Sequence, residues 1–137
     1  MQKKRDLSEK DLKNIKCIFD DIFPKEENVF KLLKNSAADI LYIEDKSFVI
    51  FLNANLDYSE VEILFIATKF DKRNKGYASI LVEELKKISK SIFLDVNETN
   101  ISAINFYKKH GFIEIYRRKR YYANRDDAIV MNWRKDE

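Results

Sequence analysis

The chain has 137 residues, the size of one ordinary domain, and we expect a single domain over residues 1–137. Its 45% hydrophobic and 36% charged residues suffice for a buried core and exclude a disordered tail. Only two glycines, one cysteine and one histidine are present. These counts exclude a Gly-x-Gly-x-x-Gly dinucleotide loop, a Gly-x-x-x-x-Gly-Lys phosphate loop, a Cys-rich zinc site and a disulfide within the chain.

Two helices are expected at the beginning of the chain. Ser8 and Asp11 have the spacing of a helix-capping box, and apolar residues then recur at helical spacing from Leu12 until Pro24 ends the pattern. A second, shorter helix is predicted over residues 26–34, where apolar side chains again share one face.

Three strands are expected next, because the hydrophobic period changes. Residues 39–44 and 47–53 are rich in β-branched and aromatic residues, and Asp45 and Lys46 between them are typical of a tight hairpin. Residues 61–68 continue as a third apolar strand.

A charged loop over residues 69–75 leads into a predicted helix over residues 77–90. Strand 61–68, this loop and this helix are the elements of a crossover connection to the next strand. Four apolar side chains of the helix are expected to face the core: Ile80, Leu81, Leu85 and Ile88.

The last third of the chain predicts a strand over 91–96, a helix over 100–109 and two strands over 112–116 and 128–133. Gly111 follows the helix at the position where a positive φ is cheap only for glycine. The resulting order, ααβββαβαββ, predicts an α/β fold with a mixed sheet flanked by helices. A right-handed crossover would make strands 61–68 and 91–96 a parallel pair.

The loop before the helix at residue 77 has the features of an anion site. A loop that leads directly into a helix presents unpaired N–H groups and the positive end of the helix dipole. Gly76 lets a phosphate approach the backbone closely, and Lys72, Arg73 and Lys75 add positive charge. The alternative is an ordinary turn with solvated lysines.

Three motifs resemble known families. Residues 73–78 resemble the Q/R-x-x-G-x-G/A acetyl-CoA loop of the GNAT superfamily of N-acetyltransferases. The stretch 93–112 resembles its N-x-x-A-x-x-x-Y-x-x-x-G-F signature, carried here by Asn100, Ala103, Tyr107, Gly111 and Phe112. Residues 118–122 and 127–131 resemble the R-x-x-Y-Y and D-A-x-x-M ending of RimI-type N-terminal alanine acetyltransferases. The resemblance is dense from Glu60 to Trp133, so the expected sheet is GNAT-like.

This resemblance implies acetyl-CoA as cosubstrate and no metal. It implies that the pantetheine arm pairs with the backbone of Ile66, Ala67 and Thr68, which also polarises the thioester carbonyl, and that Asn100 contacts the same arm. The pyrophosphate is expected on the N–H groups of one segment: Arg73, Asn74, Lys75, Gly76, Tyr77, Ala78 and Ser79.

Tyr107 is the candidate general acid. It follows Asn100 by seven residues, about two helical turns, so both side chains can face one cleft. A phenol there can donate a proton to the thiolate that leaves during acetyl transfer. The alternative is a core aromatic residue of an amphipathic helix.

Two acids are candidates for the general base. The resemblance implies Glu62, at the position of the glutamate of histone-type members, or Asp95, where RimI-type enzymes carry a glutamate. Aspartate is one methylene shorter, and misplacement on the ångström scale can cost on the order of 10²-fold in rate. We favour Glu62, with Asp95 acting through a water as the alternative; either acid alone is also consistent with a solvated strand residue.

The acceptor is expected to be an α-amine. An α-amine has a pKa of about 7.7–8.0 against about 10.4 for lysine, so a weak base suffices for an N-terminus. Tyr121 and Tyr122 are expected to wall the acceptor peptide, although basic and aromatic residues 117–122 also suit RNA.

His110 is interpreted as a residue that complements the dipole at a helix C-terminus.

The most specific function that these observations predict is acetyl transfer from acetyl-CoA to a protein N-terminus. The resemblance implies the alanine of a small-subunit ribosomal protein. Small-amine or lysine acetylation is the alternative among enzymes, and a non-catalytic ribosome- or RNA-associated module is the alternative from another class. A net charge of +3 predicts no direct nucleic-acid binding, and the lack of a long apolar run predicts no membrane span and a cytoplasmic location. A monomer or weak dimer is expected, although the sequence does not give the oligomeric state.

Overall fold

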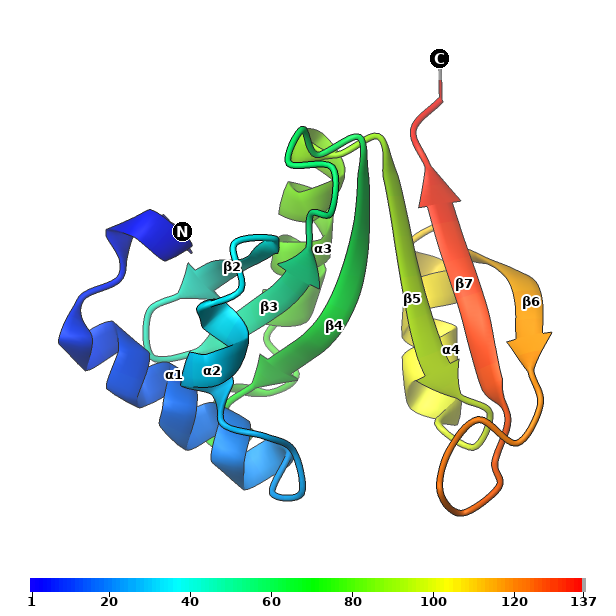
Figure 1. Cartoon of the computed structure of the whole chain (residues 1–137), viewed down its shortest axis with the longest axis horizontal. Coiled ribbons are helices and arrows are strands. Elements are labelled where there is room, and N and C mark those ends of the chain that lie inside the picture. The colour runs from blue at the N-terminus through cyan, green and yellow to red at the C-terminus, as the bar shows by residue number, and fades with distance from the viewer. Residues whose placement is uncertain (137) are drawn as a thin grey trace.

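The computed structural model describes residues 1–136, which form one mixed sheet with helices on both faces (Figure 1). The sheet order is β1-β2-β3-β4-β5-β7-β6, and among these pairs only β4 and β5 run parallel. The expected α/β class and the parallel pair are confirmed. The strands are β1 (Gln2–Lys3), β2 (Ala38–Ile43), β3 (Ser47–Leu52), β4 (Glu60–Thr68), β5 (Ser91–Asn97), β6 (Ile113–Arg118) and β7 (Ala128–Arg134).

Helices α1 (Glu9–Ile22) and α2 (Val29–Leu33) cover one face of the sheet, over β2 to β4. The capping box of α1 is confirmed, because Ser8 Oγ accepts a bond from the N–H of Asp11. The predicted helix over 26–34 is too long. Its start is delayed by Asn28, which has an extended ψ of 124° and caps the helix by accepting from the N–H of Phe30 at 2.8 Å.

Two features at the N-terminal end of the sheet differ in how well the sequence predicts them. The hairpin between β2 and β3 is confirmed, and Asp45 takes a positive φ of 58° in its turn. Strand β1 was missed, since two residues are too few to show a period; Gln2 pairs with Tyr42 and Lys3 with Leu41.

Helices α3 (Tyr77–Ile88) and α4 (Ile101–Lys109) cover the other face. The prediction that Ile80 faces the core is wrong, because this side chain is 47% exposed while Leu81, Val82 and Leu85 are buried. At about 100° per residue, Ile80 lies outside the stripe that these three define. Helix α4 ends as expected, with Gly111 at a φ of +86°.

The loop before α3 and the end of α3 both differ from what the sequence predicts. A 3₁₀ turn over Phe70–Lys72 occupies part of the predicted charged loop. Helix α3 ends two residues before the predicted end, because Ser89 is extended and its hydroxyl donates to the carbonyl of Leu85 at 2.6 Å. Among residues 1–136, no helix is both long enough and apolar enough to pass through a membrane.

The parallel pairing of β4 and β5 covers only four residues on each strand. It joins Glu60–Ile63 to Ser91–Leu94, after which β4 continues to pair with β3, and β5 with β7. The two central strands therefore separate beyond Ile63, as Figure 1 shows.

A β-bulge in β4 decides which side chains face which helices. The register with β3 passes from Phe51–Ile63 to Ile50–Phe65, which leaves Leu64 as the extra residue. Before the bulge, Ile63 packs in the cluster under α3 and α4; after it, Phe65 packs under α1 and α2, and Ile66 packs under α3 and α4. The bulge thus reverses the alternation of side chains halfway along β4.

Candidate active site

A groove of about 630 Å³ lies where β4 ends, α3 begins and α4 begins. We call it the loop groove. Every residue that the sequence predicted to hold a cofactor lines it, except Lys75, whose side chain is exposed. The predicted residues that line it are Ile66, Ala67, Thr68, Arg73, Asn74, Gly76, Tyr77, Ala78, Ser79, Asn100 and Tyr107.

The backbone of the loop groove is open to an anion. Asn74 and Gly76 both have positive φ values, 62° and 84°, and a Cβ built on Gly76 would meet no heavy atom within 4 Å. Within residues 1–136, no backbone or side-chain acceptor takes a bond from the N–H groups of residues 73–79. Unpaired N–H groups at a helix start favour negative charge, and Lys72 and Arg73 add positive charge to the same groove.

Asn100 caps a helix with its amide oxygen and, within residues 1–136, leaves its amide nitrogen free. Its Oδ1 caps α4 by accepting from the N–H of Ala103 at 3.3 Å. Its Nδ2 has no partner within the described part of the chain, and the residue lines the loop groove. The amide can therefore hold the helix and still donate into the groove.

Tyr107 is mostly a core residue whose hydroxyl remains available. The residue is only 5% exposed and its ring packs against Phe106 and Phe112 at 5.2 and 5.3 Å between centroids. Burial raises the pKa of the phenol, so it stays protonated at neutral pH. Within residues 1–136, every fully buried side-chain oxygen has a hydrogen-bond partner. The Tyr107 hydroxyl has none among these residues, so it is not fully buried, and because Tyr107 lines the loop groove we infer that the hydroxyl reaches it.

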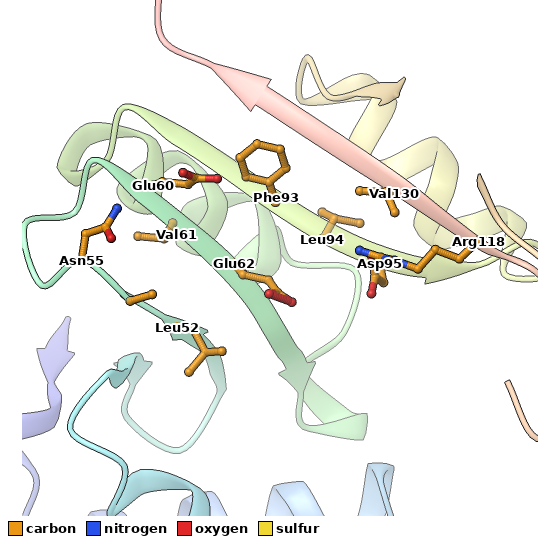
Figure 2. Close-up of a pocket in the computed structure, with 11 residues that line it drawn as sticks. Leu52, Asn55, Glu60, Val61, Glu62, Phe93, Leu94, Asp95, Arg118 and Val130 are labelled. Carbon is orange, nitrogen blue, oxygen red and sulfur yellow. The ribbon is translucent and has the colours of Figure 1, made fainter. Parts of the chain in front are cut away.

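A second groove, of about 350 Å³, contains both candidate bases. We call it the carboxylate groove. Figure 2 shows Glu62 from β4 and Asp95 from β5 on neighbouring strands, with Arg118 of β6 beside Asp95. Leu52, Asn55 and Phe93 also line it; the sequence did not single them out, because nothing in their spacing marks them.

The two acids of this groove have different surroundings. Asp95 Oδ1 lies 3.7 Å from Nε of Arg118, an ion pair that sequence reasoning missed. Burial raises the pKa of Glu62, the negative charge of Asp95 raises it further, and Arg118 offsets part of the effect. A carboxylate with a raised pKa is a better proton acceptor near neutral pH.

The two predicted acceptor tyrosines lie in the loop between β6 and β7. Burial, and then the charge of Asp95, raise the pKa of Tyr122, but neither tyrosine lines the carboxylate groove. Tyr121 is 54% exposed; its ring stands nearly perpendicular to that of Tyr122, 5.2 Å away, and 5.7 Å from the guanidinium of Arg118.

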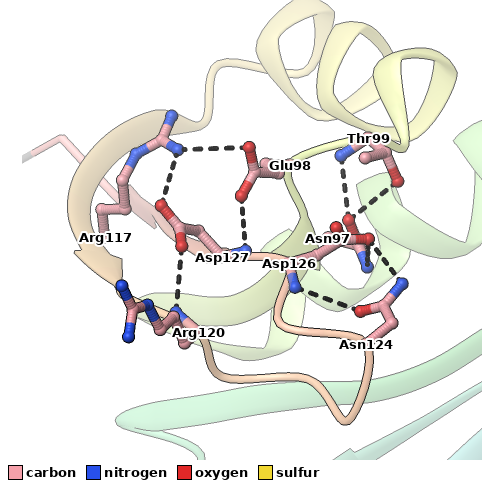
Figure 3. A network of polar contacts seen from close by, with 8 residues as sticks. All are labelled: Asn97, Glu98, Thr99, Arg117, Arg120, Asn124, Asp126 and Asp127. Atoms are coloured by element: carbon pink, nitrogen blue, oxygen red, sulfur yellow. Dashed lines mark hydrogen bonds and ion pairs between the residues drawn. The ribbon is translucent and has the colours of Figure 1, made fainter.

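A polar network holds this tyrosine loop in place (Figure 3). Asp127 accepts from the backbone N–H of Arg120 at 2.9 Å and from Arg117 at 3.1 Å, and its own N–H donates to Glu98. The bond from Arg120 and the contact with Arg117 lower the pKa of Asp127, so the carboxylate stays ionised at neutral pH. This motif aspartate therefore positions the loop that carries Tyr122.

The loop groove and the carboxylate groove lie on opposite faces of the sheet. Glu62 precedes the bulge at Leu64 and Ile66 follows it, so the reversed alternation turns these two side chains to different faces. Ile66 follows Glu62 by four positions along β4, about 13 Å. Both grooves border the stretch where β4 and β5 have separated, so a ligand in one can meet a ligand in the other there.

Comparisons with known proteins show which proteins this chain resembles. The chain is 33% identical over 75 residues to an N-alpha-acetyltransferase of Sulfurisphaera tokodaii; the alignment covers 50% of this chain and 45% of that relative. The chain thus spans about half the length of the curated relatives it matches.

Its structure also resembles solved ones. One is the ribosomal-protein-S18-alanine N-acetyltransferase from Escherichia coli, with a TM-score of 0.75, 25% identity and coverage of 96% of this chain and 92% of that one. Another is Arabidopsis thaliana NAA60 in complex with acetyl-CoA, which at 20% identity shares the fold, with a TM-score of 0.74 over 93% of this chain and 95% of that one. The model of the acetyltransferase (GNAT) family matches residues 14–112, so this chain belongs to the GNAT family.

Proposed function

We propose that this chain is an acetyl-CoA-dependent N-acetyltransferase that acetylates the N-terminal amine of a protein. The observation that carries the proposal is the pair of grooves on opposite faces of the sheet, which adjoin where β4 and β5 separate. One has an open anion-binding loop and a phenol, and the other has two carboxylates.

The loop groove fits acetyl-CoA by its chemistry. Its free N–H groups and Lys72 and Arg73 suit a pyrophosphate, and the space beside Gly76 admits one. Beyond Ile63, β4 has no strand partner on the β5 side, so its backbone is free to pair with the pantetheine arm and polarise a carbonyl. When bound, acetyl-CoA supplies the acetyl group as a reactive thioester.

The side chains supply the proton transfers. Glu62, with its raised pKa, accepts a proton from the attacking amine, directly or through a water. Tyr107 keeps its proton until a thiolate forms in the loop groove and then donates it. Asp95 pairs with Arg118 in the groove that also contains Glu62, and its carboxylate attracts a cationic amine there.

A protein N-terminus is the acceptor that this groove suits best. A partly buried carboxylate is a modest base, and an α-amine needs less help than a lysine because its pKa lies near 8. Tyr122 lies in the loop that Asp127 fixes through the backbone of Arg120, and its ring is suited to wall an extended peptide. The motifs shared with RimI-type enzymes and the similar Escherichia coli structure support an alanine of a small-subunit ribosomal protein as the target.

The direct test is coenzyme A release in the presence of acetyl-CoA. We expect a peptide that begins with alanine to be acetylated at its N-terminus faster than spermidine is acetylated, and both faster than the rate without acceptor. A faster reaction with spermidine would make this a small-amine acetyltransferase. Release at the acceptor-free rate with every amine, despite bound acetyl-CoA, would favour a non-catalytic module.

A further inference from the structure

A chain of hydrogen bonds leads from the loop groove to the space between α3 and α4. Ser79 Oγ lies 3.0 Å from Nε2 of His110, and the other ring nitrogen, Nδ1, lies 2.8 Å from Oε2 of Glu83. Ser79 lines the groove, whereas His110 does not, and its side chain is only 10% exposed. His110 thus reaches the contents of the groove through the hydroxyl of Ser79.

This contact revises the interpretation of His110 made from the sequence. The residue does lie at the C-cap of α4, but its ring bonds to α3 and not to the last carbonyls of its own helix. The ring also packs on Phe106 at 4.7 Å. The imidazole therefore connects the helix that begins at the anion loop to the helix that carries Tyr107.

The charged groups around His110 show that one ring nitrogen, Nδ1, carries a hydrogen. From α3, Glu83 and Lys86 face it: Lys86 Nζ lies 3.0 Å from Glu83 Oε2 and donates to the carbonyl of His110. From α4, Lys109 precedes it and lines the groove. Burial by itself raises the pKa of Glu83, but the bonds to His110 and Lys86 outweigh it and lower the pKa. The ionised carboxylate accepts, so Nδ1 carries a hydrogen.

The other ring nitrogen, Nε2, accepts a hydrogen bond in the neutral imidazole and donates one in the imidazolium. These two states have opposite effects on Ser79. In a neutral imidazole with its hydrogen on Nδ1, Nε2 accepts the hydroxyl proton of Ser79, and none is left for the groove. In the imidazolium, Nε2–H donates to Ser79 Oγ instead. The hydroxyl hydrogen is then free to turn into the groove and donate to an anion there.

We propose that binding of the coenzyme A pyrophosphate in the loop groove takes up a proton at His110, because only the imidazolium frees the Ser79 hydroxyl to donate to phosphate. His110 is then a positioning residue that acts through Ser79. This inference rests on the proposed function and adds to it a protonation step far from the reacting atoms. Linkage requires the converse: affinity for coenzyme A falls as pH rises through the titration of His110, at most about tenfold per pH unit.

The wild-type protein allows a clean measurement, because His110 is the sole histidine of the chain. In protein labelled with ¹⁵N-histidine, the ring signals report this residue alone. We expect their titration midpoint to move to higher pH when coenzyme A is saturating. Calorimetry in buffers with different protonation enthalpies should show an uptake of up to one proton for each coenzyme A bound.

Ser79 variants separate the hydrogen-bond route from a simple charge effect. The phosphate charge alone would also favour a protonated His110, and that effect would persist in Ser79→Ala. We expect Ser79→Ala to lose most of the proton uptake and of the pH dependence of binding, and Ser79→Thr, which keeps the hydroxyl, to retain both. His110→Gln keeps a hydrogen-bonding side chain that does not titrate, so only the pH dependence that comes from the ligand's own 3′-phosphate should remain.

The outcomes distinguish this inference from the proposed function. Coenzyme A binding by wild-type protein with no proton uptake, or full uptake in folded Ser79→Ala, would overturn the role of His110 and leave the proposed function standing. Failure of folded wild-type protein to bind coenzyme A at all would overturn the proposed function, and the role of His110 with it.

Discussion

Glu62 and Asp95 share one groove, but only Asp95 has a cationic partner, since Arg118 lies 3.7 Å from it. We predict that Glu62→Gln lowers kcat by roughly 10²-fold or more at pH 7, as expected for loss of a general base. The rate should partly recover above pH 8, where the peptide amine deprotonates by itself. Steady-state kinetics across pH tests this, with acetyl-CoA affinity as the control.

The matched variant is Asp95→Asn, which has the same change of charge in the same groove. Its effect on kcat should be mild, because Asp95 acts on Glu62 and on the approaching amine through its charge. The reverse order of the two effects would assign the base to Asp95. In that case Asp95→Glu, which restores the missing methylene, should raise the rate.

The raised pKa of Glu62 predicts the acidic limb of the pH profile. The base must be deprotonated to act, so kcat/KM should fall as pH drops through a pKa above the usual 4.3 or so of glutamate. Asp95→Asn removes a repulsive charge and should move this limb to lower pH, whereas Arg118→Gln removes an attractive one and should move it higher. A shift of the acidic limb in the same direction in both variants would contradict the assignment of this limb to Glu62.

Tyr107 has a mainly apolar environment, yet its hydroxyl reaches the loop groove. We predict that Tyr107→Phe lowers kcat by roughly 10²-fold and leaves acetyl-CoA affinity nearly unchanged, because the ring and its packing remain. Single-turnover rates and calorimetry measure the two quantities. Turnover equal to that of the wild type would reduce Tyr107 to a packing residue of α4.

The loop that begins α3 depends on backbone conformation more than on its side chains. Gly76 has a φ of +84° and open space where a Cβ would stand. We predict that Gly76→Val abolishes acetyl-CoA binding and leaves the fold intact, since the loop is exposed and a branched side chain opposes this φ and occupies the phosphate approach. Calorimetry measures binding, and circular dichroism measures folding.

Gly76→Asn serves as the control, because asparagine tolerates a positive φ. If this variant also fails to bind, the side chain blocks the groove; if it binds, backbone strain explains the loss in Gly76→Val. Affinity equal to that of the wild type in a folded Gly76→Val would remove the phosphate site from this loop.

For the whole molecule, the decisive feature is how unevenly the helices cover the sheet. Helices α1 and α2 lie over β2 to β4, while the same face of β5 and β7 carries the carboxylate groove and no helix (Figure 1). That groove is therefore open to an extended peptide chain. The site borders the place where the central strands part.

This open groove and its modest base together predict the preferred amine. A peptide with a free N-terminal alanine should be acetylated faster than the same peptide with a blocked N-terminus and a free internal lysine, because an α-amine is neutral far more often at pH 7. Competition between the two peptides, followed by mass spectrometry, measures the preference. Faster acetylation of the lysine would make this a lysine acetyltransferase.

Much of the fold and the site follows from local sequence. Ser8, Gly76, Asn100 and Gly111 act at helix ends, where one side chain or one φ decides the backbone, and all four stand where their residue types predict. The lining of the loop groove is predicted where its residues belong to the motifs, whereas Ile22, Ser102, Phe106 and Lys109 also line it and were not predicted. The prediction from sequence is wrong where the local signal is weak. It misses the two-residue strand β1, and it turns Ile80, which lies just outside an apolar stripe, toward the core.

The sequence by itself determined the family resemblance, the anion loop and the position of Tyr107 two turns after Asn100. Only the tertiary structure decided what depends on distant segments. The bulge at Leu64 arises from pairing with β3, and it turns Glu62 and Ile66 to opposite faces. Arg118 reaches Asp95 across strands, and His110 meets Ser79 across 31 residues. Such contacts depend on register and packing, which no short motif encodes.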